Sequence, residues 1–302
     1  MTLTQARLSV DEGAGTYFRS RRARLTEALW AYGFLAPSFL IFAVFVFYPL
    51  YRTARQTFYQ PGLYPDAPQR WIGWDQWTDV LGDSEFHATI GRTVLLSVMT
   101  VIPALVLGLL LAWLVNQPLR GIAVFRIVFS TPVATSVAVA SLVFLILLNP
   151  QGGVLKVDWL QHRTPALMSI ALTNIWQNLG ITFIIILAGL QSVPDDLIEA
   201  AKIDGAGAFR RLRHVIIPTI SPTLMFAVVI LTIVSFQTFG QIDILTQGGP
   251  QNATRVIVYD IFTERGSDPG GAAVKSIILF GGLVLLTFVQ FAALNRRVHY
   301  GD

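Results

Sequence analysis

Cysteine is absent from this chain of 302 residues, and histidine is scarce. Without cysteine, no disulfide framework, iron–sulfur cluster or thiol chemistry is available to the protein. The four histidines are His87, His162, His214 and His299. They are scattered along the chain and form no pair with the spacing of metal ligands on a helix. Because metal sites need clustered ligands, we expect no metal site.

Charge is also sparse. Charged residues make up 13% of the sequence and hydrophobic residues 53%, whereas a soluble globular protein carries about 25% charged residues. This balance indicates a membrane protein surrounded by a lipid bilayer. The formal net charge is +4, but the arginines flank apolar segments and do not alternate with aromatic residues on one face. We therefore expect no nucleic-acid partner.

Long apolar runs are what the sequence does contain. Crossing the hydrocarbon core takes about 20 apolar residues in a helix. Six segments qualify, namely residues 29–50, 93–115, 127–148, 167–190, 215–238 and 274–294. Prolines such as Pro132 and Pro222 lie within them, and neighbouring helices can satisfy the carbonyl groups that proline leaves free. We predict an all-α polytopic membrane domain at 29–294 with six transmembrane helices, between an N-terminal segment 1–28 and a tail 295–302.

The distribution of lysine and arginine predicts the orientation of the chain. With six spans, both termini lie on the same side of the membrane. The segments on that side hold thirteen of the 22 Lys and Arg residues, and the longer segments on the other side hold eight. Lys275, near the start of the last span, is the remaining one. Because cytoplasmic loops are enriched in these residues, both termini are predicted to be cytoplasmic.

Two segments predicted to be external have features that a simple connecting loop lacks. Residues 52–92 contain Trp71, Trp74 and Trp77 among several prolines. These tryptophans fit an aromatic belt at the membrane interface, and a docking surface for an external partner is the alternative. Residues 239–273 are long for a simple connection, which predicts a folded loop.

The most polar cytoplasmic loop, at about residues 192–214, has a helix–glycine–helix pattern. Ser192 and Asp195 have the spacing of a capping box, which predicts the start of a short amphipathic helix. Gly205 is expected to end this helix with a positive φ, and a second short helix is predicted over about 208–214. The first helix is acidic, so an anionic leaflet would repel it. A groove on a protein partner suits it better than the alternative, an interfacial helix on the lipid surface.

A resemblance to a known family adds to this picture. The residues that carry it are Glu199, Ala200, Ala201, Gly205, Val215, Ile217 and Pro218. Their order and spacing resemble the EAA motif of permease subunits of binding-protein-dependent ABC importers. The stretches ALWAYGFLAPSFLIFAVFVFYPL, DILTQGGPQNAT and FVQFAALNRRVHY extend the resemblance over nearly the whole chain, toward the carbohydrate and glycerol-3-phosphate type. Arg92 and Lys275 depart from the family pattern, which often has asparagine at the first position and a small or apolar residue at the second.

The resemblance implies the fold of a type I importer permease in a prokaryotic inner membrane. It implies that the polar loop is a coupling helix, which docks in a groove of a separate ATP-binding subunit. The residues implied for this contact are Glu199, Ala200, Ala201, Asp204, Gly205, Arg210 and Arg211. The implied partners are a second homologous permease, two ATP-binding subunits that use ATP and Mg, and an extracytoplasmic solute-binding protein. The chain itself would bind no cofactor and would not be an enzyme.

Polar residues within the spans suggest where a solute passes. Such residues are costly in a membrane unless they face a cavity or another helix. Asn174, Gln177 and Asn178 have the i, i+3, i+4 spacing that places them on one helical face. The full candidate path comprises Thr135, Ser136, Asn174, Gln177, Asn178, Gln237, Gln241 and Asp243. Amides and hydroxyls suit a hydroxylated solute, because each desolvated hydroxyl needs a partner. Hydrogen bonding between spans is the alternative role.

The expected solute is therefore small and hydroxylated, such as glycerol-3-phosphate, a glycerophosphodiester or a sugar. A phosphate normally calls for arginine, and no arginine lies in the middle of a span, so a purely neutral mono- or oligosaccharide is the alternative. A passive channel would leave the acidic loop unexplained. A membrane enzyme would need a nucleophile or metal motif, and the string GGAAVKS at 270–276 lacks the glycine that precedes lysine in a phosphate-binding loop.

Overall fold

A computed structural model describes residues 21–60, 68–117 and 121–295. The chain divides into two units after Arg52. The first unit contains helix α1 (Arg21–Phe42), the π-helical turn η1 (Ala43–Phe47) and the start of α2 (Tyr48–Gln56). None of the residues in the most apolar window of its span is buried within the chain. A helix that is apolar on all sides is typical of a membrane span.

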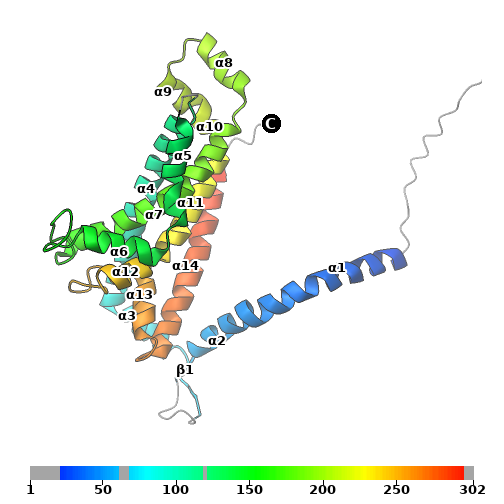
Figure 1. The fold of residues 1–302 in the computed structure, drawn as a ribbon. Helices are drawn as coiled ribbons and strands as arrows, with labels where there is room; N and C mark the ends of the chain where they lie inside the picture. Colours follow the sequence, from blue (N-terminus) through cyan, green and yellow to red (C-terminus); the bar gives the residue numbers. More distant parts are fainter. Residues whose placement is uncertain (1–20, 61–67, 118–120, 296–302) are drawn as a thin grey trace, which may run out of the picture. The chain divides into compact units, whose positions relative to one another are not determined.

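The second unit is almost entirely helical (Figure 1). One short antiparallel hairpin, β1 (Tyr59–Gln60) with β2 (Arg70–Trp71), pairs Tyr59 with Trp71. The helices are α3 (Asp75–Gly82), α4 (Ser84–Val115), α5 (Ile122–Ser130), η2 (Thr131–Ala134), α6 (Val137–Leu147), α7 (Arg163–Gln191), α8 (Asp195–Ile203), α9 (Ala208–Arg211), η3 (Leu212–Ile216), α10 (Ile217–Thr219), α11 (Ser221–Phe236), α12 (Gly240–Leu245), α13 (Ile257–Glu264) and α14 (Pro269–Asn295). The all-α prediction is confirmed.

The described residues contain four helices that are long and apolar enough to cross a membrane, and six if each of two bent helix pairs counts as one span. The six predicted spans are therefore recovered on the second way of counting. Of the predicted flanking segments, residues 1–20 and 296–302 lie outside the described part of the chain. Helix α1 already begins at Arg21, inside the segment assigned to the N-terminus.

Two spans expected to be continuous are bent. The third bends by 103° between η2 and α6, and the fifth bends by 75° between α10 and α11. Pro132 lies at the start of η2 and Pro222 at the start of α11. Proline lacks the N–H group that would continue a helix, so each bend begins a new helix. Ser136 then caps α6, accepting a hydrogen bond from the backbone N–H of Val139 at 3.3 Å.

Helices α4 and α7 form the centre of the second unit, and α11 packs against both. A buried apolar cluster lies where these helices meet the loop around α8 and α9; it includes Ala112, Phe183, Leu190, Leu212 and Ile216. The loop is thereby joined to the ends of three spans through closely packed side chains.

The segments predicted to be external are folded, as expected for 239–273. Residues 240–245 and 257–264 form α12 and α13. At the same end of the unit, Phe58 stacks on Trp71 with ring centroids 5.6 Å apart and meets Trp74 edge-on. Trp71 and Trp74 are both exposed, so they are available to a membrane interface or to an external partner.

Candidate coupling loop and transport path

The loop that carries the EAA-like residues stands at one end of the molecule as helix α8 followed by α9 (Figure 1). Helix α8 begins after Pro194, whose position provides no side-chain cap. The predicted capping box is therefore wrong. The hydroxyl of Ser192 instead donates to the carbonyl oxygen of Gly189 at 2.8 Å, at the end of α7.

A turn at Gly205 separates the two helices, as predicted. Gly205 has a φ of +75°, a conformation that glycine adopts without steric cost. The N–H of Ala206 donates to the carbonyl of Ala201 at 2.9 Å, which is the long hydrogen bond of a Schellman motif. The guanidinium of Arg211 donates to the carbonyl of Ala206 at 2.6 Å. Hydrogen bonds to both flanking helices thus stabilise the turn, and the bond from Arg211 positions the two helices within the loop.

Helix α8 has an inward and an outward face. Ile198 packs against the buried cluster, and Ala201 is half-buried. Glu199 and Ala200 are exposed, and Ile203 is 86% exposed. Such a pairing of an exposed aliphatic side chain with an exposed carboxylate is suited to a groove with an apolar floor and a polar rim.

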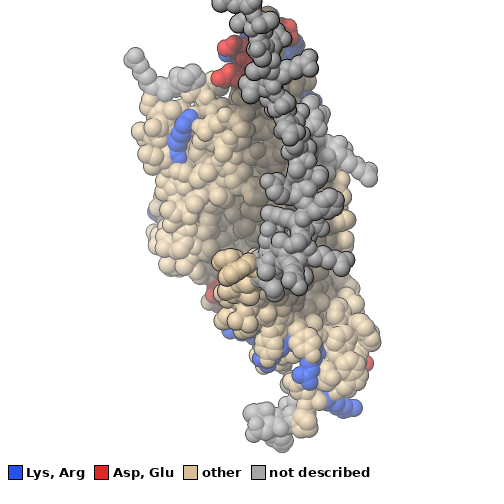
Figure 2. All heavy atoms as spheres, turned by 90° about the vertical axis from the view of Figure 1, so that its right-hand side faces the viewer, with Lys and Arg blue, Asp and Glu red and all other residues tan. Residues whose placement is uncertain are grey.

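The remaining residues of the predicted coupling set surround this face. Asp204 and Arg210 are exposed. Figure 2 shows acidic side chains at its top, where this loop lies, and few charged residues in the middle of the surface that it draws. Leu212 and Ile216, which follow α9, are buried against the cluster that contains Leu190. A displacement of the loop would therefore be transmitted to α7 and α11.

Two neighbouring cavities lie beside the break in the third span. One, of about 260 Å³, is lined by Thr135, Gln177, Asn178 and Gln241 together with apolar side chains. The other, of about 220 Å³, is lined by eight residues, which include Asn174, Gln237, Gln241 and Val137. Six of the eight predicted path residues are thus brought to these cavities, from α7, the end of α11, α12 and the break before α6.

The same amides also join the spans. The side-chain N–H of Gln241 donates to the side-chain oxygen of Gln177 at 2.9 Å. Gln177 donates in turn to the carbonyl of Thr135 at 3.3 Å. Asn174 donates to the hydroxyl of Thr238 at 3.0 Å. Lining a cavity and bonding neighbouring helices, which the sequence presented as alternatives, therefore coexist at these residues.

Two predicted path residues lie elsewhere. Ser136 caps α6, and Asp243 lies on α12 without lining either cavity. Asp243 faces toward Tyr259, whose pKa is raised first by burial and then by this carboxylate. Thr238 and Phe239 line the smaller cavity and were not predicted. The polar run that contains Gln237 and Gln241 was the available signal for Thr238.

Residues 93–300 match the family described as binding-protein-dependent transport system inner membrane component. The chain belongs to this family. It is a permease subunit of a binding-protein-dependent importer and a component of the inner membrane. The match covers the coupling loop, both cavities and all spans after the first.

Two relatives of the permease are similar over most of its length. The sn-glycerol-3-phosphate transport system permease protein UgpA of Agrobacterium fabrum is 32% identical over 285 residues, which are 89% of this chain and 96% of the relative. The protein of the same name from Rhizobium meliloti is 33% identical over 296 residues, which are 93% of this chain and all of the relative.

Solved structures show the same fold. A chain of a bacterial ABC transporter involved in the import of the acidic polysaccharide alginate superposes with a TM-score of 0.79 at 21% identity, covering 90% of the permease and 97% of that chain. A chain of the alginate transporter in complex with an alginate pentasaccharide-bound periplasmic protein gives a TM-score of 0.78 at 20% identity, covering 94% and 100%. The type I importer permease fold expected from the sequence is confirmed.

Proposed function

We propose that the permease imports a small hydroxylated solute, such as sn-glycerol-3-phosphate, a glycerophosphodiester or a sugar, delivered by an extracytoplasmic binding protein. The names of the two relatives support the first of these solutes. The amides and hydroxyls around the two cavities support the general class, because they offer partners to solute hydroxyls that have lost their water.

In this proposal, two separate ATP-binding subunits hydrolyse ATP with Mg. A second homologous permease completes the membrane path. The outward face of α8 is the observation that carries the coupling step. Glu199 and Ile203 point away from the bundle while Ile198 is packed into it. A groove in an ATP-binding subunit would hold the outward face, and movement of the groove would tilt the spans through Ile198.

The proposed location is a prokaryotic inner membrane with both termini in the cytoplasm. The excess of lysine and arginine on the side that holds the coupling loop supports this orientation. Residues 1–28 and 295–302 would then be cytoplasmic flanking segments.

A purely neutral mono- or oligosaccharide is the second candidate solute. The observation in its favour is that the described lining of the two cavities includes no Lys, Arg or His. A phosphate that lost its water there would lack the cation it normally requires. If the solute is phosphorylated, its phosphate would be bound by the partner permease or would stay hydrated while its hydroxyls contact this chain.

Reconstitution of the complete importer tests the proposal. The permease is expected to copurify with ATP-binding subunits, and the ATPase activity of the complex with its binding protein is expected to rise with the transported solute. Stimulation by sn-glycerol-3-phosphate or a glycerophosphodiester would support the first solutes, and stimulation by neutral saccharides alone would support the second. Solute flux without any ATPase would contradict the importer and indicate a passive channel.

A further inference from the structure

Arg92 and Lys275 belong to one charged network around α13, at the end of the second unit opposite α8 (Figure 1). The guanidinium of Arg92 pairs with Glu85 at 2.6 Å and donates to the backbone carbonyl of Arg255 at 3.0 Å. Lys275 pairs with Asp260 at 2.6 Å and with Glu264. The side chain of Arg255 connects the two parts, because it binds both of these carboxylates.

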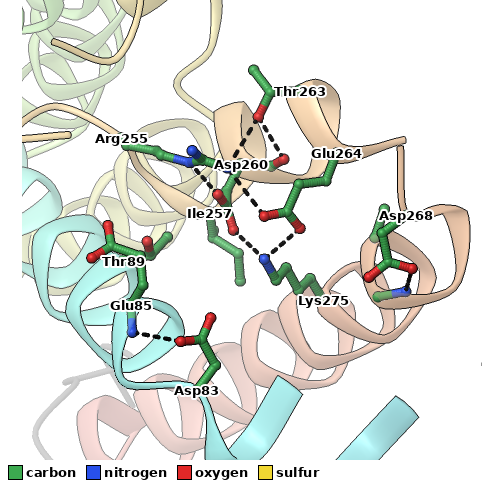
Figure 3. Close-up of polar contacts among 12 residues, drawn as sticks. Asp83, Glu85, Thr89, Arg255, Ile257, Asp260, Thr263, Glu264, Asp268 and Lys275 are labelled. Carbon is green, nitrogen blue, oxygen red and sulfur yellow. Dashed lines mark hydrogen bonds and ion pairs between the residues drawn. The ribbon is translucent and has the colours of Figure 1, made fainter. Parts of the chain in front are cut away.

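Lys275, Asp260, Arg255 and Glu264 form a closed ring of alternating charges, which we call the outer ion ring (Figure 3). Arg255 and Glu264 complete it with a contact of 3.1 Å. Lys275 is 5% exposed and Asp260 is 2% exposed. The ring is electrically neutral. Removal of Lys275 would leave Asp260 and Glu264 sharing Arg255 alone, and an uncompensated negative charge at a buried site is strongly unfavourable.

Polar contacts, those of the outer ion ring among them, hold helix α13 against two neighbours. Asp260 and Glu264 lie on α13, and Lys275 lies near the start of α14. The N–H of Ile257, the first residue of α13, donates to the hydroxyl of Thr93 on α4 at 3.0 Å. The position of α13 is therefore fixed by polar contacts from α4 on one side and from α14 on the other.

Helix α13 also contacts the transport path. Phe239 lines the cavity of about 220 Å³ and immediately precedes α12, which carries Gln241. Two rings from α13 pack against Phe239: Tyr259 is stacked with centroids 6.0 Å apart, and Phe262 is tilted at 4.6 Å. Tyr259 is adjacent in sequence to Asp260, so the outer ion ring and the aromatic contact share one turn of helix.

We propose that Lys275 is a positioning residue for transport: through the outer ion ring it fixes α13, and α13 fixes the ring of Phe239 in the wall of the solute cavity. Arg92 supports the arrangement by holding the backbone of Arg255. The inference rests on the proposed function of the two cavities as the solute path.

Two pairs of variants test the inference in the reconstituted importer. Lys275→Met leaves the ring with an excess negative charge, whereas Lys275→Met combined with Glu264→Gln leaves a neutral Arg255–Asp260 pair. Tyr259→Leu removes the stacked ring without touching a charge, and Tyr259→Phe is its matched control. The measurement is the initial rate of uptake per assembled complex, with radiolabelled sn-glycerol-3-phosphate and radiolabelled maltose as probes, together with the melting temperature.

Lys275→Met is expected to lower the uptake rate per complex by about tenfold, equivalent to about 1.4 kcal/mol. The reason is that the excess buried negative charge favours displacement of α13 from Phe239. The neutral double variant is expected to recover most of that rate. Tyr259→Leu is expected to lower uptake in the same way, and Tyr259→Phe to keep it near the original rate.

The inference is overturned if assembled Lys275→Met complexes take up the probe normally and differ only in melting temperature. It is equally overturned if Tyr259→Leu and Tyr259→Phe transport at the same rate, and this comparison decides the matter if Lys275→Met does not assemble. If the unmodified importer takes up neither probe and neither stimulates its ATPase, then the proposed solutes fail. Normal uptake by the unmodified importer with equal rates for the two Tyr259 variants removes only the positioning role.

Discussion

Gly205 determines the shape of the coupling loop. Its φ of +75° lies in the left-handed region, and a Cβ atom added there would meet nothing within 4 Å. A substitution is therefore opposed by the backbone alone and not by a clash with neighbours. Gly207, two residues later, also has open space around it but has an extended conformation at the start of α9, with a φ of −64°.

We predict that Gly205→Val distorts the turn and lowers uptake, because a non-glycine residue held in the left-handed region costs about 1–3 kcal/mol. Gly207→Val is the matched control and is expected to leave uptake nearly unchanged. The measurement is uptake per assembled complex, with the amount of retained ATP-binding subunit recorded on the same preparation. Equal behaviour of the two variants would show that the positive φ is irrelevant to coupling.

The side-chain amide of Gln177 both bonds neighbouring helices and lines a cavity. Its amide accepts from Gln241 and donates to the carbonyl of Thr135, and its side chain lines the larger of the two cavities. Gln241 is almost completely buried, so loss of Gln177 would leave a buried amide group without its partner. An uncompensated group of this kind is destabilising.

Gln177→Leu is predicted to lower both uptake and thermal stability. The loss of stability should be modest, since hydrogen bonds between membrane helices contribute about 0.6 kcal/mol on average. Gln237→Leu is the comparison, because Gln237 lines a cavity but is exposed. Uptake and melting temperature measured together separate the two roles. Lowered stability with normal uptake per complex would assign Gln177 to helix packing alone.

Among the helices, the break in the third span depends on a close approach to α7. A Cβ atom added to Gly180 would lie 2.8 Å from a methyl carbon of Val133 and 2.9 Å from its backbone nitrogen. The second contact is with backbone, which cannot rotate away. Gly180 thus permits η2 to rest on α7 directly beside the hydrogen bond between Gln177 and Thr135.

Gly180→Ala is predicted to push η2 away from α7 and to destabilise the complex by about 1–3 kcal/mol, the usual cost of overpacking. Uptake should fall as well, since Thr135 would move relative to Gln177. Gly282→Ala in α14 is the control, because a Cβ atom there meets nothing within 4 Å. Thermal unfolding of the two purified complexes checks the prediction, and an unchanged melting temperature for Gly180→Ala would contradict it.

The elements differ in how far the sequence predicts them. Apolar runs predict the spans because a membrane requires a fixed length of apolar helix. The turn at Gly205 is predictable because its signal is local. The break between Ala134 and Val137 was missed, since Pro132 alone does not distinguish a kinked helix from two helices at 103°. Ser192 likewise had the spacing of a cap, but α8 begins only after Pro194, and the Ser192 hydroxyl donates to the carbonyl of Gly189 at the end of α7.

At the scale of the whole molecule, the sequence does not predict which distant segments contact one another. Gln177 and Gln241 are 64 residues apart, and helical periodicity predicts only which face each occupies. The two partners of Lys275, Asp260 and Glu264, become visible only when α13 and α14 are packed together. Helical spacing did place Asn174, Gln177 and Asn178 on one face, and the structure brings that face to the cavities.

The orientation of the chain can be tested directly, because it contains no cysteine. Single cysteines at exposed positions can therefore be labelled without background. Ile203 lies on α8 and is 86% exposed, and Val154 lies between α6 and α7 and is 78% exposed. In the permease produced without its ATP-binding subunits, which would cover Ile203, we predict that a membrane-impermeant maleimide reacts with Ile203→Cys only from the cytoplasmic side and with Val154→Cys only from the outside. Labelling of both from one side would contradict the six-span topology.

The central claim is that the outward face of α8 couples solute movement to ATP hydrolysis in a partner subunit. The most direct measurement is ATP-driven uptake into proteoliposomes by importers carrying Glu199→Lys, with retention of the ATP-binding subunit measured on the same preparation. Asp158→Lys, at another exposed carboxylate outside the loop, is the control for reversal of charge. We predict that Glu199→Lys inserts normally but loses uptake, while Asp158→Lys transports normally. Normal uptake and normal retention of the ATP-binding subunit in the Glu199→Lys importer would contradict the account.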